Sequence, residues 1–237
     1  MRKTLKDLIE SVRQANIRLK ETGLVILTWG NVSGIDREKS MVAIKPSGVD
    51  YDELQAADIV LTDLDGNIVE SSLHSSSDLP THLKLYKAFP EIGGIVHTHS
   101  AYATAFAQAC RSLPCLGTTH ADYFYGEVPV TDEMDLSDIQ SDYEAHTGDM
   151  IIKKIKQLKI NPMDCPSIFV ANHASFSWGE SVSKAVENAV VLEEVCRMAW
   201  LTFSLSGEMK PIQQSLLDKH FLRKHGAKAY YGQKGEG

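Results

Sequence analysis

Two histidines one residue apart, His97 and His99, directly follow the apolar run of residues 93–96 (GGIV). In an extended strand, side chains two positions apart point to the same face, so both imidazoles can reach one point where the strand ends. A third histidine, His173, follows a second strand-like run at residues 167–172 (SIFVAN). Three histidines with one open coordination position describe a catalytic zinc site. Pairs of this spacing also occur by chance on protein surfaces, so the spacing alone leaves both interpretations open.

Length and composition set broad limits on the fold and on the partners. A chain of 237 residues with 43% hydrophobic and 23% charged residues suits one large domain or two small ones. The net charge of −7 argues against a general nucleic-acid-binding protein, whose binding surface is usually basic. A small phosphorylated ligand remains possible, because a few local donors suffice to bind one phosphate.

The cysteines and the hydrophobic runs suggest a cytoplasmic protein. The four cysteines (Cys110, Cys115, Cys165 and Cys196) form no CxxC pair and no disulfide framework. The N-terminus runs directly into an amphipathic pattern without a secretory leader, so we expect a reducing cytoplasm. The longest hydrophobic region, residues 185–205, is interrupted by charged residues, so we expect no membrane association.

Hydrophobic periodicity predicts mixed helices and strands, with no internal repeat and no linker. Helices are predicted over residues 5–19, 80–89, 101–109, 142–158, 182–197 and 211–225. Strands are predicted over residues 41–44, 59–61, 68–69, 116–119, 127–130 and 167–172, with a hairpin joining the second and third. We therefore expect an α/β fold of the α+β type: a single domain, residues 1–237, with a central, mostly antiparallel β-sheet flanked by α-helices.

Several loops at strand ends carry glycines and hydroxyls that could present N–H groups and short donors to a phosphate. They contain Gly30, Asn31, Ser47, Gly48, Ser76 and Ser77. Lys45 could add positive charge. The same residue types are the usual ones in ordinary turns, so no single loop decides between the two interpretations.

Three further residues are candidates for the chemistry. Asp78 could be a metal ligand or a base, or the N-cap of the helix that follows it. Asp122 could transfer a proton, or could be a solvated loop carboxylate. Tyr231 lies six residues from the C-terminus, where chains commonly fray.

Six motifs occur in an order that resembles the class II aldolase/epimerase superfamily, and within it the branch of sugar-phosphate 4-epimerases. They are residues 28–33 (TWGNVS), 44–48 (IKPSG), 76–78 (SSD), 94–100 (GIVHTHS), 118–124 (TTHADYF) and 171–174 (ANHA). The match runs from about residue 5 to residue 231. Six ordered motifs are far more specific than any one of them.

The resemblance implies a role for each matching residue. It assigns the metal ligands to Asp78, His97, His99 and His173. It assigns phosphate and substrate binding to Gly30, Asn31, Lys45, Ser47, Gly48, Ser76 and Ser77. Asp122 and Tyr231 match the two catalytic acid/base residues, and Thr118, Glu144 and His220 match supporting positions.

The resemblance also implies an isomerase with a class II aldolase-like fold. It would interconvert L-ribulose 5-phosphate and D-xylulose 5-phosphate by zinc-assisted cleavage and re-formation of the C3–C4 bond. This reaction serves pentose catabolism, of L-arabinose or of L-ascorbate and L-xylulose. One Zn²⁺ per subunit is expected, with manganese or cobalt as alternatives. The implied partners are a phosphorylated ketopentose and three further copies in a C4 homotetramer, with active sites at the subunit interfaces.

Two other functions remain as alternatives. The related fuculose and rhamnulose phosphate aldolases share the metal, but they carry glutamate at the position of Asp78 and have different C-terminal tails. The fold also serves as the non-catalytic head domain of membrane-skeleton proteins. Retention of the three histidines, Asp122 and Tyr231 argues against that second alternative.

Overall fold

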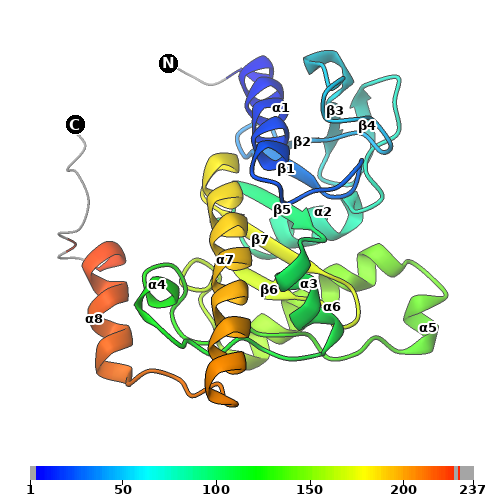
Figure 1. Ribbon diagram of the computed structural model, residues 1–237. Helices are drawn as coiled ribbons and strands as arrows, with labels where there is room; N and C mark the ends of the chain where they lie inside the picture. Colours follow the sequence, from blue (N-terminus) through cyan, green and yellow to red (C-terminus); the bar gives the residue numbers. More distant parts are fainter. Residues whose placement is uncertain (1–3, 227–228, 230–237) are drawn as a thin grey trace.

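The centre of the molecule is a seven-stranded sheet with the strand order β4-β3-β2-β1-β5-β7-β6, in which every neighbouring pair is antiparallel. The computed structural model describes residues 4–226 and 229 (Figure 1). The strands are β1 (Asn31–Asp36), β2 (Met41–Ile44), β3 (Val60–Asp63), β4 (Ile68–Glu70), β5 (Gly94–Thr98), β6 (Ser167–Phe169) and β7 (Ser175–Gly179).

Helices cover both faces of this sheet. They are α1 (Leu5–Glu21), α2 (Leu79–Ala88), α3 (Ala101–Gln108), α4 (Thr118–Ala121), α5 (Leu136–Ile139), α6 (Tyr143–Leu158), α7 (Val182–Ser206) and α8 (Gln214–His225), with a short 3-10 turn at Ala56–Asp58. Among the described residues, no helix has both the length and the apolar character needed to cross a membrane.

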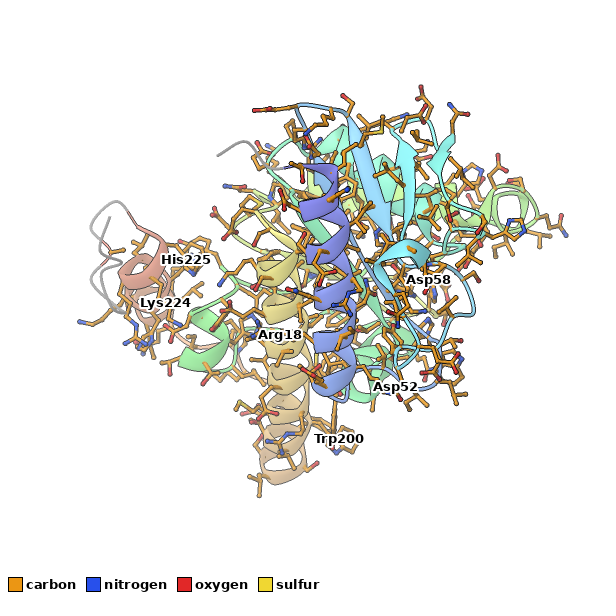
Figure 2. All side chains as sticks on the ribbon, turned by 90° about the horizontal axis from the view of Figure 1, so that it is seen from above. Arg18, Asp52, Asp58, Trp200, Lys224 and His225 are labelled. Atoms are coloured by element: carbon orange, nitrogen blue, oxygen red, sulfur yellow. The ribbon has the colours of Figure 1, made fainter. Side chains whose placement is uncertain are left out.

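Strand alternation decides which helices lie on which face. Val32 and Val96 are register partners whose side chains pack with α1 and α7, and these two helices lie side by side (Figure 2). On the opposite face, Ile95 and Phe176 pack in the largest apolar cluster, which contains residues of α2 and α6. The predicted sheet flanked by helices is confirmed.

A pair of glycines lets α7 approach the sheet closely. Gly34 of β1 and Gly94 of β5 are register partners. A Cβ at Gly34 would lie 2.6 Å from the Val182 side chain, and one at Gly94 would lie 2.5 Å from the Val182 backbone. Real Cβ atoms do not tolerate such distances, so the N-terminus of α7 packs here only because both residues lack a side chain.

The helix predictions are confirmed, with α7 reaching further than expected, to Ser206. The strands at 41–44, 59–61 and 68–69 are also confirmed. The predicted strand at 167–172 is shorter, because the chain turns after Phe169 toward β7. Strands β1 and β7 were not predicted.

Two predicted strands are wrong. Residues 118–121 form the short helix α4, whose turn is held by backbone bonds from Ala121 to Gly117 and from Asp122 to Thr118. His120 anchors this turn by a 2.7 Å bond between its Nε2 and the Gly126 carbonyl. Residues 127–130 make only isolated bridges rather than a strand. Helix α8 packs against α4, at one side of the molecule (Figures 1 and 2).

Candidate active site and metal centre

The candidate site lies on the α2/α6 face, where β1 and β5 meet the first turn of α2. Asn31 of β1, His97 of β5 and Phe176 of β7 are consecutive register partners across the sheet. Directly opposed residues in antiparallel strands point to the same face, so these three side chains form one row. The His97 ring stacks on Phe176 at 4.4 Å between centroids, which fixes the imidazole plane.

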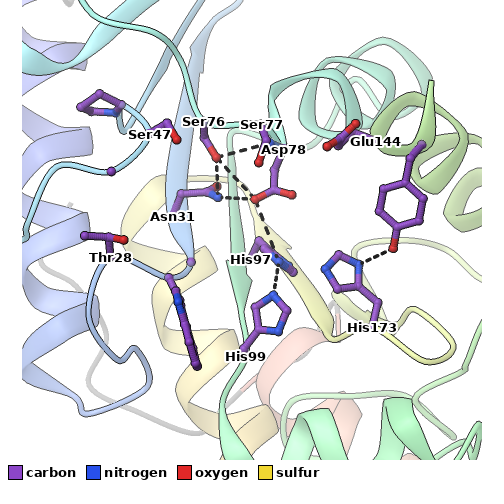
Figure 3. A pocket seen from close by; sticks show the side chains of 15 residues that line it. Thr28, Asn31, Ser47, Ser76, Ser77, Asp78, His97, His99, Glu144 and His173 are labelled. Atoms are coloured by element: carbon purple, nitrogen blue, oxygen red, sulfur yellow. Dashed lines mark hydrogen bonds and ion pairs between the residues drawn. The ribbon is translucent and has the colours of Figure 1, made fainter. Parts of the chain in front are cut away.

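Three imidazoles converge at this row, as the sequence predicted. His97 lies within β5, His99 follows the end of β5, and His173 lies in the turn between β6 and β7 (Figure 3). One ligand atom from each lies within 4.8 Å of those from the other two, and the Nε2 atoms of His97 and His99 are 3.0 Å apart. This is the single cluster of potential metal-binding side chains identified within residues 4–226.

The tautomer of His97 can be assigned from its partner. Its Nδ1 lies 3.0 Å from the Ser175 carbonyl oxygen, which can only accept a hydrogen bond, so Nδ1 carries the hydrogen. In the neutral ring the lone pair is then on Nε2, which faces the other two imidazoles. Orientation of a ligating histidine through its second ring nitrogen is typical of metal sites.

Asp78 adds a carboxylate to this cluster. It is the first residue before α2, but its side chain makes no N-cap hydrogen bond. Instead, its Oδ2 accepts a 2.7 Å hydrogen bond from Asn31 Nδ2 and lies 4.0 Å from His97 Nε2. The side chain thus points into the site rather than capping its own helix.

The charges of these groups suit a cation. Burial and the neighbouring His97 and His99 together lower the pKa of His173 to about 4; burial also lowers the pKa of His99. Burial alone would raise the pKa of Asp78, but the nearby His97 and His82 and the Asn31 hydrogen bond hold it below its usual range. Neutral imidazoles beside an ionised carboxylate are the protonation states that metal ligands require.

The donor set therefore fits a divalent transition metal. Ligand nitrogens of a tetrahedral site with bonds of about 2.0–2.1 Å lie roughly 3.3 Å apart, close to the observed 3.0 Å between His97 and His99. Imidazole nitrogens with one carboxylate suit zinc, manganese or cobalt better than calcium or magnesium. The three histidines could bind one metal ion.

A pocket of about 530 Å³ opens beside the triad, within the usual size range for small-molecule sites. It brings together the metal candidates and most of the predicted phosphate loops. Its lining includes Gly30, Asn31, Ser47, Gly48, Ser76, Ser77, Asp78, His97, His99, Glu144 and His173 (Figure 3). Gly30 has a φ of +78°, and a Cβ there would lie 2.8 Å from the His97 carbonyl oxygen, so this loop requires glycine beside β5.

Lys45 does not line the pocket, contrary to the prediction for it. Its side chain is buried and its Nζ donates 2.6 Å to the Val49 carbonyl, over the ring of Tyr51. The Tyr51 hydroxyl reaches the carbonyls of Trp29 and Gly30 at 2.9 and 2.8 Å. Lys45 and Tyr51 thus connect two pocket loops without lining the pocket themselves. The Lys45 ammonium contacts protein carbonyls, where a contact with phosphate was expected.

Burial of Lys45 predicts a pH-dependent stability. Burial lowers the pKa of the ammonium from 10.5 to about 8. Between these values the unfolded chain binds the proton more strongly, so the unfolding free energy should rise with pH, by up to about 3 kcal/mol. Urea unfolding of the wild type and of Lys45→Met from about pH 7.5 to 10.5 isolates this effect. A difference between the two proteins that stays constant over this range would contradict it.

Asp122 lies elsewhere, together with two of the three predicted supporting residues, Thr118 and His220. The Asp122 carboxylate accepts bonds of 3.1 and 2.7 Å from Arg223 and lies 3.1 Å from His220 Nδ1. Burial would raise its pKa, but these two partners hold it below its usual range. Thr118 begins α4. None of these residues lines the pocket, and Tyr231 lies outside the described residues.

Two aromatic lining residues were not predicted. Tyr143, at the start of α6, lies with its hydroxyl 3.3 Å from His173 Nδ1, and Trp29 packs edge-on against His99. Trp29 adjoins the predicted Gly30, so its motif was the available signal. Nothing in the spacing around Tyr143 singled it out.

Known proteins resemble this chain over nearly its whole length. The model of the family described as Class II Aldolase and Adducin N-terminal domain matches residues 10–200. An L-ribulose-5-phosphate 4-epimerase UlaF of Salmonella paratyphi B is 49% identical over 230 residues, covering 97% of this chain and 100% of that protein. The protein of the same description from Salmonella typhi is also 49% identical over 97% of this chain and 100% of its own length.

Solved structures agree with this relationship. An L-fuculose 1-phosphate aldolase superposes with a TM-score of 0.76 at 25% identity, covering 90% of this chain and 94% of that one. The segment that the family model matches, residues 10–200, includes the three histidines, Asp78 and all of the pocket loops. The chain belongs to the class II aldolase and adducin N-terminal domain family.

Proposed function

We propose that this protein is an L-ribulose-5-phosphate 4-epimerase, an isomerase that interconverts L-ribulose 5-phosphate and D-xylulose 5-phosphate. The observation that carries the proposal is a triad of histidines with Asp78 in a pocket lined by hydroxyl and glycine loops. The proteins with that name that are 49% identical over 97% of the chain support the same substrate.

The chemistry explains why an aldolase-like site suits an epimerase. The C4 proton of a ketopentose phosphate is not acidic, because no carbonyl group is adjacent to C4. Breaking the C3–C4 bond avoids its removal and gives an enediolate of dihydroxyacetone and glycolaldehyde phosphate. The aldehyde can rotate before the bond re-forms on its other face. A bound divalent ion would supply Lewis-acid stabilisation of the negative charge that develops on the substrate oxygens.

The chain's own residues would bind and orient both fragments. Asp78, His97, His99 and His173 would hold the ion, which we propose to be one Zn²⁺ per subunit. Ser47, Gly48, Ser76 and Ser77 present hydroxyl and N–H groups in the same pocket, where they would retain the phosphate of the aldehyde while it turns. Asn31 joins the two halves, because its amide donates to both Ser76 Oγ and Asp78 Oδ2.

The proton transfers need two groups on opposite faces of the aldehyde. We propose Asp122 and Tyr231 for these roles, with Thr118, Glu144 and His220 supporting the site. Asp122 does not line the pocket of its own subunit, so it would act in a neighbour's. Such a role requires active sites at subunit interfaces, and we propose a C4 homotetramer as the assembly, in which residues 1–237 form one domain. We place it in the cytoplasm, in the catabolism of L-arabinose or of L-ascorbate and L-xylulose.

Product analysis distinguishes this proposal from its main alternative, an aldolase of the fuculose or rhamnulose phosphate type, which shares the fold. The purified protein is incubated with L-ribulose 5-phosphate. An epimerase yields D-xylulose 5-phosphate, whereas an aldolase accumulates glycolaldehyde phosphate. Accumulation of glycolaldehyde phosphate without D-xylulose 5-phosphate would overturn the proposal.

A further inference from the structure

The ring of His173 is held in a different way from that of His97. His97 lies within β5, where its ring stacks on Phe176 and its Nδ1 bonds to the Ser175 carbonyl. His173 lies in the turn between β6 and β7 and is only partly buried. Within the described part of the chain, its side chain has one hydrogen-bond partner, the Tyr143 hydroxyl. The direction of the His173 ring therefore depends on Tyr143.

Tyr143 contacts the edge of the His173 ring that faces away from the other two imidazoles. The Tyr143 hydroxyl lies 3.3 Å from His173 Nδ1, while His97 and His99 lie on the other side of this ring (Figure 3). The two nitrogens of an imidazole are directed to opposite edges of the ring. With Nδ1 bound to Tyr143, Nε2 is the nitrogen of His173 that faces the triad.

The Tyr143 hydroxyl can accept a hydrogen bond from the tautomer of His173 that binds a metal. A ligating Nε2 offers its lone pair, so the hydrogen of the neutral ring is then on Nδ1. Nδ1–H donates to the Tyr143 oxygen, because a hydroxyl both accepts and donates. The hydroxyl hydrogen is left to donate into the pocket that Tyr143 lines. One contact thus fixes the ring plane and satisfies the hydrogen that metal binding places on Nδ1.

Tyr143 is itself held by the helices on either side of it. It begins α6, where Thr147 Oγ1 donates a 3.0 Å hydrogen bond to its carbonyl. The buried Thr81 of α2 donates a 2.5 Å hydrogen bond to the carbonyl of the next residue, Glu144. Helix α2 is also the helix that Asp78 directly precedes. The same pair of helices therefore places Asp78 and Tyr143 relative to the triad.

We propose that Tyr143 is a positioning residue for the metal site, whose hydroxyl accepts a hydrogen bond from His173 Nδ1–H and directs His173 Nε2 toward the metal. Tyr143 acts through His173 and is not itself a ligand. A hydrogen-bond partner behind a ligating histidine typically contributes about 10- to 100-fold to metal affinity. The partner here is a neutral hydroxyl at 3.3 Å, longer than the usual N–H···O distance of about 2.9–3.0 Å. We therefore expect an effect at the lower end of this range.

Tyr143→Phe tests the inference, because it removes the hydroxyl and keeps the ring. Zinc affinity, measured by competition with a chromophoric chelator, should fall about 10-fold. Tyr125→Phe is the matched control, since it removes a hydroxyl that bonds to Asp218 at 2.7 Å and does not line the pocket. Its zinc affinity should equal that of the wild type. Thermal unfolding of the metal-free proteins controls for folding.

Cobalt provides a readout that a general loss of packing would not change. The visible absorption bands of bound Co²⁺ report on the ligands around the ion. Loss of the bond to Nδ1 makes His173 a weaker and less well oriented ligand. The bands of Co²⁺-loaded Tyr143→Phe should therefore shift from those of the wild type, whereas those of Tyr125→Phe should coincide with them.

The inference rests on the proposed metal site, but the two fail differently. A wild-type protein that binds neither zinc nor cobalt at the triad contradicts the metal site itself. Wild-type protein that binds both, with Tyr143→Phe unchanged in zinc affinity or in its cobalt bands, contradicts only the role of Tyr143.

Discussion

The His99→Asn variant is expected to lose its bound metal and to turn over L-ribulose 5-phosphate at least about 1000-fold more slowly. A Lewis-acid metal contributes several kcal/mol to charge stabilisation, and each 1.36 kcal/mol corresponds to a factor of ten in rate. His99 is the best position for this test because it follows the end of β5, so its replacement leaves the sheet pairing intact. Metal content per subunit and the rate of D-xylulose 5-phosphate formation are measured on the same sample.

His74→Asn is the matched control for this variant. His74 is an exposed histidine in the serine-rich loop before α2, and it belongs to no cluster of potential metal ligands among the described residues. It should retain both metal and turnover. If His99→Asn kept one ion per subunit and wild-type turnover, the triad would not be the metal site.

Asp122→Asn is expected to slow epimerisation by about 10²–10⁴-fold, the usual contribution of one positioned acid or base, while metal content stays unchanged. The proton of the C4 hydroxyl must leave on cleavage and return on the other face, and an amide cannot accept it. Tyr231→Phe should have an effect of similar size for the same reason. Asp132→Asn, which removes a partly exposed carboxylate paired with Lys154, should leave the rate unchanged.

The position of Asp122 makes a sharper prediction about assembly. A site built from two subunits should be repaired when His99→Asn and Asp122→Asn chains are co-expressed and purified through two different tags. In such mixed oligomers roughly a quarter of the sites combine two intact halves, so activity should return although each variant alone is inactive. Mixed oligomers that remain inactive would mean that Asp122 acts within its own subunit.

The metal candidates could be predicted because their signal is local. Strand alternation predicts that His97 and His99 point to the same side, and an apolar run predicts that His173 follows a strand. The side-chain direction of Asp78 was beyond such reasoning. An aspartate before a helix usually caps it, and only the contact with Asn31 across the interface between β1 and α2 turns it into the pocket.

The features that the sequence did not predict are those that distant contacts decide. The segment NVSGID of β1 is rich in residues that strands avoid, and it is extended because β2 and β5 pair with it on both sides. Lys45 sits in a loop with the composition of a phosphate site, yet Val49 and Tyr51 hold its ammonium behind that loop. Asp122 is bound by Arg223, about a hundred residues later in the chain. Periodicity within a short window contains none of these partners.

Proton NMR of L-ribulose 5-phosphate conversion in D₂O tests the central claim most directly. Cleavage and re-formation of the C3–C4 bond inverts C4 without removing its hydrogen. The metal-loaded protein should therefore form D-xylulose 5-phosphate that retains the C4 proton, and prior removal of the metal by a chelator should abolish the conversion until zinc is restored. Deuterium at C4 of the product, or undiminished conversion by metal-free protein, would contradict the account.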